Sequence, residues 1–357
     1  MTSADMAFIE QPKSDTHRHP FPKPHLEGFE TPLRVQMALK YLEETKSLEG
    51  MKRSTARRAK REDALLVHSP YVVHAVEIMS ELGGGYLGES SYASPELLRA
   101  SLHALGGAIE AAEQVAEGGF RHSFALVRPP GHHASTSISM GLCYFNNVAV
   151  AIRKIMTRED VQRVSILDFD NHFGNGIAEI FYSDPSVQYV SLHEYDYENF
   201  GIGHFEEIGY GKGEGTNINI PLLESSSDTS YQEALKYIVV PVIEKFNPDI
   251  IAVSAGYDAH YADPVGNMNV DSRTYWYIGK LVQKAVESLG ARGSFWVLEG
   301  GYSPFALGPS IRASLEGLQG RPRPTLEDQV DREEHELIIG TNREIIEKIL
   351  ETFSPFL

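Results

Sequence analysis

The sequence predicts a single α/β domain with a mostly parallel central sheet and helices on both faces of that sheet. From residue 120 onward, short apolar and β-branched runs alternate with amphipathic segments, which is the order that βαβ units produce. Hydrophobic residues make up 42% of the 357 positions, which is enough for a large core. We find no repeat and no low-complexity linker. We therefore expect an irregular lead-in (1–24), one domain (25–320) and a helical extension packed on it (321–357).

The amino-terminal elements are predicted from proline, glycine and capping residues. A Pro that follows Thr or Ser marks the starts of two helices, over about 31–46 and 69–83. A Gly/Ser-rich loop over 83–94 leads into a long helix over 94–117. We interpret the basic cluster at 52–61 as a solvated linker, with a docking patch as the alternative.

The rest of the domain alternates strands and helices. Apolar runs of five or six residues predict strands at 123–127, 163–167, 187–192, 217–222, 250–254 and 294–298. Amphipathic periodicity predicts helices at 146–156, 177–182, 230–246 and 272–289. A mixed-charge amphipathic helix is expected around 331–353, where it packs on the domain or meets a partner subunit of a homo-oligomer.

Composition argues against several classes of protein. The formal net charge of −17 argues against direct binding to nucleic acid, and no apolar run is long enough to cross a membrane. The first residues carry no secretory signal, and a single cysteine, Cys143, permits no internal disulfide. We therefore expect a cytoplasmic protein. We attribute the acidity to solubility, with a cationic partner such as a lysine-bearing tail or a polyamine as the alternative.

One stretch, 166–176, concentrates reactive side chains after an apolar run. Asp168, Asp170 and His172 lie at alternate positions, so an extended strand would place all three on one face. Carboxylate and neutral imidazole are ligands for Zn²⁺ and similar divalent metals. The alternative is a plain strand end with two capping aspartates and a surface histidine.

Five of the six predicted strands run into polar residues at their carboxyl ends, where open α/β sheets bind ligands. These residues are His132, His133, Asp168, Asp170, His172, His193, Glu194, Asp258, His260, Asp263, Glu299 and Tyr302. Chance would scatter them over both ends of the sheet. Their shared position predicts a catalytic site.

Chemistry suggests a role for each group. Asp170, His172 and Asp258 form a three-ligand set that leaves a fourth Zn²⁺ position open, as in catalytic sites. His132 and His133 are adjacent, and a neutral imidazole can serve as a general base.

Two further kinds of group complete the site. Asp168 and Asn175 are suitable acceptors for orienting the two histidine rings. Tyr302 follows Gly-Gly and could donate to an oxyanion.

These residues resemble the histone deacetylase superfamily, which has the arginase–deacetylase fold, and its prokaryotic and class II-like zinc deacetylases in particular. The matched stretches follow the family's order and cover roughly residues 30 to 318. They are 128–134, 141–147, 168–176, 191–193, 256–258 with 263–264, and 299–302.

The resemblance implies specific roles. Asp170, His172 and Asp258 would hold Zn²⁺. His133 would be general base and then acid, and His132 its electrostatic partner. Asp168 would hold the ring of His132, Asn175 would hold that of His133, and Tyr302 would polarise the acetyl carbonyl. The resemblance further implies a monovalent cation, usually K⁺, at Asp168, Ser191 and Leu192, and substrate-binding roles for Gly141, Leu142, Phe200, Arg34 and Glu89.

The chain also departs from the family pattern. Phe173 replaces a second histidine that is not a ligand, and Leu142 replaces an aromatic residue of the tunnel. Glu299 stands where many members have Gly, and the loop at 199–204 differs in sequence. Glu89 takes the place of an aspartate that many relatives carry on the rim.

The expected activity is zinc-dependent hydrolysis of the acetyl-amide of acetyl-lysine in proteins or peptides. An acetylated polyamine or another small amide is the alternative substrate. A non-catalytic acetoin-utilisation-type protein is the alternative of a different class. His132, His133 and Tyr302 argue against it, because a binding protein needs no general base.

Overall fold

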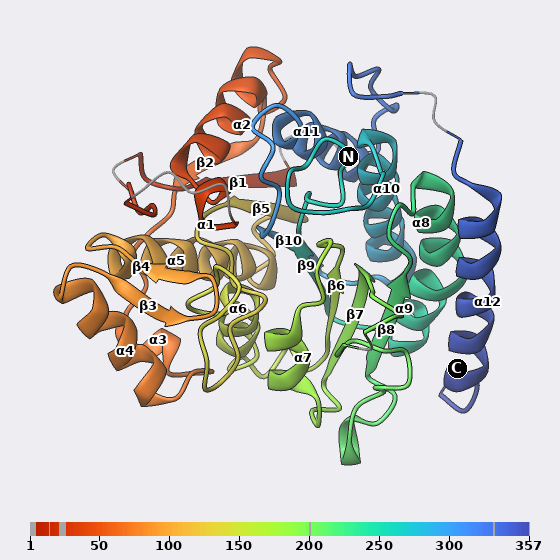
Figure 1. Cartoon of the computed structure of the whole chain (residues 1–357), viewed down its shortest axis with the longest axis horizontal. Helices are drawn as coiled ribbons and strands as arrows, with labels where there is room; N and C mark the ends of the chain where they lie inside the picture. Colours follow the sequence, from red (N-terminus) through yellow and green to blue (C-terminus); the bar gives the residue numbers. More distant parts are fainter. Residues whose placement is uncertain (1–4, 14, 21–25, 200, 331–332, 357) are drawn as a thin grey trace.

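An eight-stranded sheet forms the centre of the protein (Figure 1). The computed structural model describes residues 5–13, 15–20, 26–199, 201–330 and 333–356. The strand order is β2-β1-β5-β10-β9-β6-β7-β8, and every neighbouring pair is parallel. The predicted single-domain α/β architecture is confirmed.

The six predicted strands are present, and two more extend the sheet at one edge. The sheet strands are β1 (Met6–Glu10), β2 (Lys52–Thr55), β5 (His122–Leu126), β6 (Val164–Asp168), β7 (Val187–Glu194), β8 (Asn217–Leu222), β9 (Ile250–Ala255) and β10 (Gly293–Leu298). The six predicted strands are buried almost throughout. Parallel strands covered on both faces are expected to be continuously apolar, which is why the sequence reveals them.

Helices cover both faces of this sheet, and a separate hydrophobic cluster lies between each face and its helices. One face carries α2 (Pro32–Glu44), α8 (Asp228–Ala234), α9 (Val240–Phe246), α10 (Ser272–Leu289), α11 (Leu307–Leu318) and α12 (Glu336–Phe353). The other carries α4 (Pro70–Glu81), α5 (Leu97–Ala116), α6 (Asn147–Ile155) and α7 (Asn175–Phe181). Two single-turn helices, α1 (Leu26–Phe29) and α3 (Arg61–Ala64), are also present, and a π-helical segment, Leu235–Val239, joins α8 to α9. None of the helices in these described ranges is both long and apolar enough to cross a membrane.

Three interpretations of the amino-terminal part were wrong. The lead-in expected to be irregular contains β1, whose Phe8 and Ile9 are fully buried against the domain. The basic cluster is not only a linker, because its first residues form the edge strand β2. The Gly/Ser-rich loop contains the antiparallel hairpin of β3 (Gly85–Gly88) and β4 (Ser91–Ala93). All three segments are short, and partners distant in sequence pair with β1 and β2, so local periodicity does not reveal them.

The carboxyl-terminal helix α12 packs on α8 and β8 of the same chain. The amide of Asn342 donates to Ser226 Oγ at 2.7 Å and to Ser230 Oγ at 2.8 Å, and this contact is buried. The first residue of the predicted helix, 331, lies outside the described residues. The helix itself begins at Glu336.

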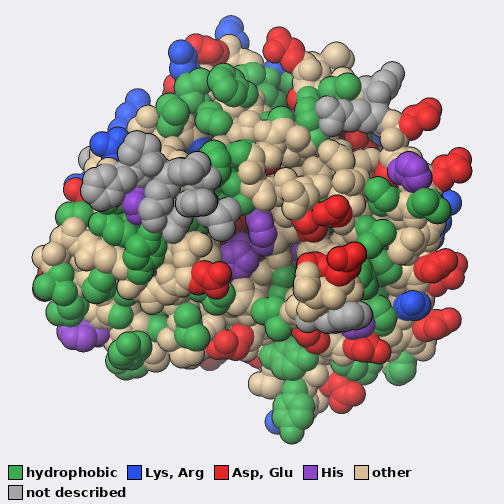
Figure 2. Space-filling view, in the orientation of Figure 1, with side chains coloured by type: hydrophobic (Ala, Val, Ile, Leu, Met, Phe, Trp, Pro, Cys, Tyr) green, Lys and Arg blue, Asp and Glu red, His purple; other side chains and the backbone are tan. Residues whose placement is uncertain are grey.

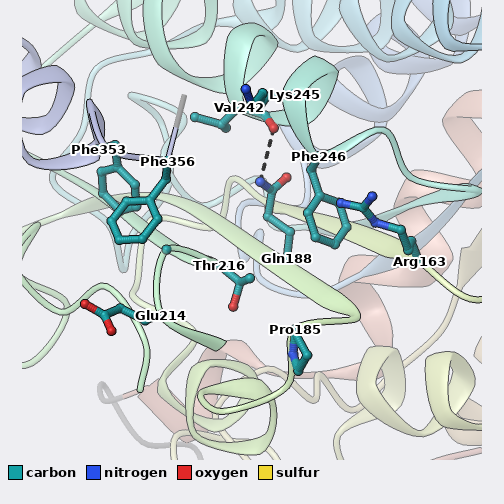
Figure 3. A pocket seen from close by; sticks show the side chains of 11 residues that line it. Arg163, Pro185, Gln188, Glu214, Thr216, Val242, Lys245, Phe246, Phe353 and Phe356 are labelled. Carbon is teal, nitrogen blue, oxygen red and sulfur yellow. Dashed lines mark hydrogen bonds between the residues drawn. The ribbon is translucent and has the colours of Figure 1, made fainter. Parts of the chain in front are cut away.

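A cavity of about 260 Å³ lies at the amino ends of β6, β7 and β8, beside α9 and the end of α12 (Figure 3). Within it the guanidinium of Arg163 stacks 4.2 Å from the ring centre of Phe246, and Gln188 donates to the carbonyl of Val242 at 3.1 Å. This cavity lies at the amino ends of the strands, on the side of the sheet opposite to their carboxyl ends. It is therefore separate from the polar residues discussed next.

Candidate active site

The polar residues predicted at the strand ends converge at the carboxyl edge of the sheet. Because the strands are parallel, the loops after β5, β6, β9 and β10 meet at one place. Figure 2 shows histidine side chains at the centre of this face, with acidic side chains beside them and along one edge. Lys and Arg are sparse near the centre.

Three side chains form a compact donor set. Ligand atoms of Asp170, His172 and Asp258 all lie within 4.8 Å of one another. His172 Nδ1 is 3.2 Å from Asp170 Oδ1 and 3.1 Å from Asp258 Oδ2, and both carboxylates are buried. Two buried carboxylates at this spacing repel each other unless a cation lies between them. One imidazole and two carboxylates match the donors of an open Zn²⁺ site, so these residues fit that metal.

The backbone holds the two carboxylates in place. Gly300 N–H donates to Asp170 Oδ2 at 2.8 Å, and Asn171 N–H donates to Asp258 Oδ1 at 2.8 Å. A Cβ on Gly300 would lie 2.3 Å from Asp258 Oδ2, so only glycine permits this approach. The strand β6 ends at Asp168, so Asp170 and His172 lie beyond it. The expectation that strand alternation places Asp168, Asp170 and His172 on one face was therefore wrong.

The two adjacent histidines have different partners and opposite charge preferences. His132 Nδ1 lies 3.2 Å from Asp168 Oδ2, and His133 Nδ1 lies 2.7 Å from Asn175 Oδ1. Burial alone would lower the pKa of His132, but Asp170 and Asp168 raise it to about 10. Burial lowers the pKa of His133 well below its usual value, and the positive charge of His132 lowers it further. The opposite directions of the two pKa shifts favour a neutral His133 beside a charged His132.

Tyr302 lies beside this cluster with its backbone fixed. Its N–H donates to Asp263 Oδ2 at 2.6 Å, and Ser303 N–H donates to the same oxygen at 3.0 Å. Gly301 before it has φ +112°, a conformation that favours glycine. Burial raises the pKa of the Tyr302 phenol well above its usual value, so the phenol stays a hydrogen-bond donor.

A buried ion cluster lies behind Tyr302. The guanidinium of Arg34 is 5.2 Å from the Tyr302 ring centre and donates to the carbonyls of Gly301 at 3.1 Å and Glu299 at 2.9 Å. Glu30 accepts from Arg34 Nε at 3.2 Å and from Arg128 Nε at 2.9 Å. Burial alone would raise the pKa of Glu30, but Arg128 and Arg34 lower it to about 2.

We expect Glu30→Gln to reduce the free energy of unfolding by about 3 kcal/mol, because it leaves two buried guanidinium groups without their carboxylate. Urea denaturation at pH 7 measures the loss. The pKa of Glu30 falls from 4.5 to about 2 on folding, so its contribution is present above pH 4.5 and disappears as the pH falls towards 2. The difference between the two proteins should shrink over that range. A constant difference would contradict the charge-based explanation, and Glu44→Gln in an exposed pair serves as the control.

Glu299 holds the loop that carries the histidine pair. Its Oε2 accepts from Gly131 N–H at 2.6 Å and from His132 N–H at 3.1 Å. Burial raises the pKa of Glu299 to about 7. Glu299, His132 and Cys143 also lie close enough to share a metal, but burial raises the pKa of the Cys143 thiol well above its usual value. The thiol is therefore a poor ligand there.

The predicted tunnel residues are only partly described. A Cβ on Gly141 would lie 2.5 Å from His133 Cδ2, so this glycine borders the histidine ring, and Leu142 follows it with φ +67°. Glu89 is exposed at the turn of the β3–β4 hairpin, and its carbonyl accepts from Gly141 N–H at 2.9 Å. Phe200 lies outside the described residues.

The residues predicted to hold a monovalent cation lie on β6 and β7. Asp168 pairs with Ser191 in register, and Leu192 follows on the same strand. Tyr189 O–H also donates to Asp168 Oδ2 at 3.1 Å. Phe173, the departure from the family pattern, packs its ring 4.9 Å from that of His193.

Four residues whose side chains contact the site or the ion cluster behind it were given no supporting role in the sequence analysis. They are Glu30, Asp263, Glu299 and Tyr189. The sequence contained a signal for two of them, because Asp263 precedes a proline near Asp258 and Glu299 is a departure from the family pattern. Glu30 and Tyr189 carried no local signal.

Comparison with known proteins identifies the family of this chain. The histone deacetylase domain family matches residues 28–318, so the chain belongs to the histone deacetylase family. It is 40% identical over 260 residues to a probable deacetylase of Methanothermobacter thermautotrophicus, covering 72% of this chain and 76% of that one. It is 35% identical over 277 residues to the histone deacetylase-like amidohydrolase of Pseudomonas aeruginosa, covering 76% and 73%.

Larger relatives and a solved structure also match. Histone deacetylase 6 of Caenorhabditis elegans is 37% identical over 309 residues, which are 82% of this chain and 32% of that protein. The chain thus spans about a third of that relative. The crystal structure of the HDA15 HD domain superposes with a TM-score of 0.87 at 28% identity, covering 99% of this chain and 95% of that one. The predicted family resemblance is confirmed.

Proposed function

We propose that this protein is a zinc-dependent deacetylase that hydrolyses the acetyl-amide of acetyl-lysine in proteins or peptides. The observation that carries the proposal is the convergence of Asp170, His172 and Asp258 beside a neutral His133. Membership of the histone deacetylase family, with relatives named deacetylase and amidohydrolase, supports a hydrolase of this class.

Asp170, His172 and Asp258 would hold the zinc ion. When bound, Zn²⁺ would supply Lewis-acid polarisation of the acetyl carbonyl and would lower the pKa of a water. His133 is neutral and can accept the proton of the attacking water at its Nε2, because Nδ1 faces Asn175. His133 then returns the proton to the leaving amine.

The other side chains assist this transfer. His132 carries a positive charge beside His133, and Asp168 fixes its ring. The Tyr302 phenol remains protonated and can donate to the oxyanion that forms on the acetyl oxygen. Asp168, Ser191 and Leu192 would bind K⁺, while Gly141, Leu142 and Arg34 would border the acetyl-lysine.

An acetylated polyamine is the second candidate substrate. The observation that favours it is the exposed carboxylate of Glu89, whose carbonyl bonds directly to Gly141 beside His133. A carboxylate at this rim could pair with a free amine of a small substrate as well as with a peptide.

Parallel assays with and without a chelator test the proposal. We expect the zinc-loaded protein to release acetate from an acetyl-lysine peptide at a higher kcat/KM than from acetylputrescine. Dialysis against a chelator should remove both activities, and added Zn²⁺ should restore them, because the donor set is needed for catalysis. Activity that survives complete removal of metal would contradict the proposal. A reversed substrate preference would favour the polyamine.

A further inference from the structure

An apolar groove lies beside the candidate active site. It encloses about 510 Å³ between α4, the β3–β4 hairpin and the loop at 137–139. Its lining consists of Tyr71, Val72, His74, Ala75, Ile78, Met79, Tyr86, Leu87, Ser137, Ile138 and Ser139. Figure 2 shows hydrophobic side chains on the side of the molecule where Figure 1 places α4 and the hairpin.

The groove differs from the rest of this acidic protein. The chain has a formal net charge of −17, yet no Asp, Glu, Lys or Arg is among the described residues that line the groove. Tyr71 is 77% exposed, Ile138 53% and Ile78 37%. Single exposed apolar residues are common on any protein, whereas contiguous apolar surfaces are typical of interaction sites.

The loop that lines the groove leads directly to Gly141 beside His133. Gly88 of the hairpin packs so closely on the loop that a Cβ there would lie 2.0 Å from the Ser139 carbonyl oxygen. Two residues further on, Gly141 borders the ring of His133 and donates its N–H to the Glu89 carbonyl. Two residues of chain span at most about 7 Å, so the groove lies close to the histidine.

We propose that this groove binds a large apolar side chain of the substrate polypeptide, within a few residues of the acetyl-lysine whose side chain enters the tunnel. The inference rests on the proposed function and narrows its substrate class to polypeptides. An extended chain advances about 3.3–3.6 Å per residue, so a near neighbour of the acetyl-lysine reaches the groove. The exposed Glu89 carboxylate, at the hairpin turn between the two sites, would face the main-chain amides or a basic residue of that chain. A small acetylated amine has no second side chain to occupy the groove.

Wild-type protein with zinc bound allows a direct test. We would measure kcat/KM for acetyl-lysine peptides that carry Leu or Ser at each of about four positions on either side of the acetyl-lysine, the reach of an extended chain. We expect Leu to raise kcat/KM by about tenfold at one or two adjacent positions, since those side chains become buried. Equal rates at every position would overturn the groove inference and leave the proposed function intact. Failure to hydrolyse any acetylated peptide would remove the proposed function and the groove inference with it.

A pair of variants locates the effect. Ile138→Ser should reduce the Leu preference to within about twofold, because it replaces an exposed apolar part of the lining. Leu337→Ser on α12, which removes a side chain that is 74% exposed, should keep the preference. Sedimentation of the same proteins tests the other occupant, a second copy of this chain. A change of oligomeric mass in Ile138→Ser with unchanged peptide preference would overturn the inference.

Discussion

Tyr302→Phe is expected to lower kcat on an acetyl-lysine peptide by ~10²-fold or more while zinc content stays unchanged. The phenol stays protonated because burial raises its pKa, so the wild-type side chain offers a donor to a developing oxyanion. Phenylalanine keeps the ring that stacks against Arg34, and its backbone N–H still donates a hydrogen bond to Asp263. The substitution therefore removes little besides the O–H group. Steady-state kinetics and elemental analysis of the same preparation measure both quantities.

Tyr257→Phe is the matched control. Tyr257 is also a buried tyrosine, and it lies next to Asp258 in the sequence. Its O–H, however, donates at 3.2 Å to Ser314 on α11 and not to the donor set. We expect it to cost about 1 kcal/mol of stability and to leave kcat nearly unchanged. Full activity of Tyr302→Phe with zinc bound would rule out the proposed role of the phenol. Equal losses in both variants would point to a general effect of removing a buried hydroxyl.

The sequence predicts those elements of the fold whose burial produces a local pattern of apolar residues. The six predicted strands are buried and mostly apolar because helices cover both faces of the sheet. β1 and β2 escaped prediction because their stability comes from pairing with β5 and with each other. α11 was not predicted either. It contains glycine and proline near its start, which lowers its helix propensity, and packing against α10 and α2 stabilises it.

The candidate site could be predicted where its residues directly follow strands. Asp170, His172 and Asp258 all lie within a few residues of a strand end, so the parallel topology brings them together. The residues that support them come from distant parts of the chain. Glu30 reaches Arg128 across 98 positions, and nothing near Glu30 in the sequence indicates that contact. The catalytic and metal-binding roles of these residues stay predictions, which the Tyr302 and Asp258 variants test.

Asp258→Ala is expected to abolish retention of zinc through dialysis. Among the described residues the donor set has three protein ligands, and Asp258 is the one that follows β9. Loss of an outer partner of a ligand typically costs about 10–100-fold in metal affinity, so loss of a ligand should cost more. Elemental analysis after dialysis measures the metal without reference to activity.

Asp258→Asn separates the loss of a ligand from a collapse of the loop. Its amide oxygen can still accept the N–H of Asn171, as Asp258 Oδ1 does at 2.8 Å, while the negative charge is gone. Burial and the neighbouring Asp170 raise the pKa of Asp258, so the two carboxylates oppose each other when no cation is bound. With this charge gone, the Asn variant should fail to gain the stability that wild type gains when Zn²⁺ is added. Glu206→Ala, which removes an exposed carboxylate, should gain as much stability from Zn²⁺ as wild type. One zinc per chain retained in both Asp258 variants would show that the ion is held elsewhere.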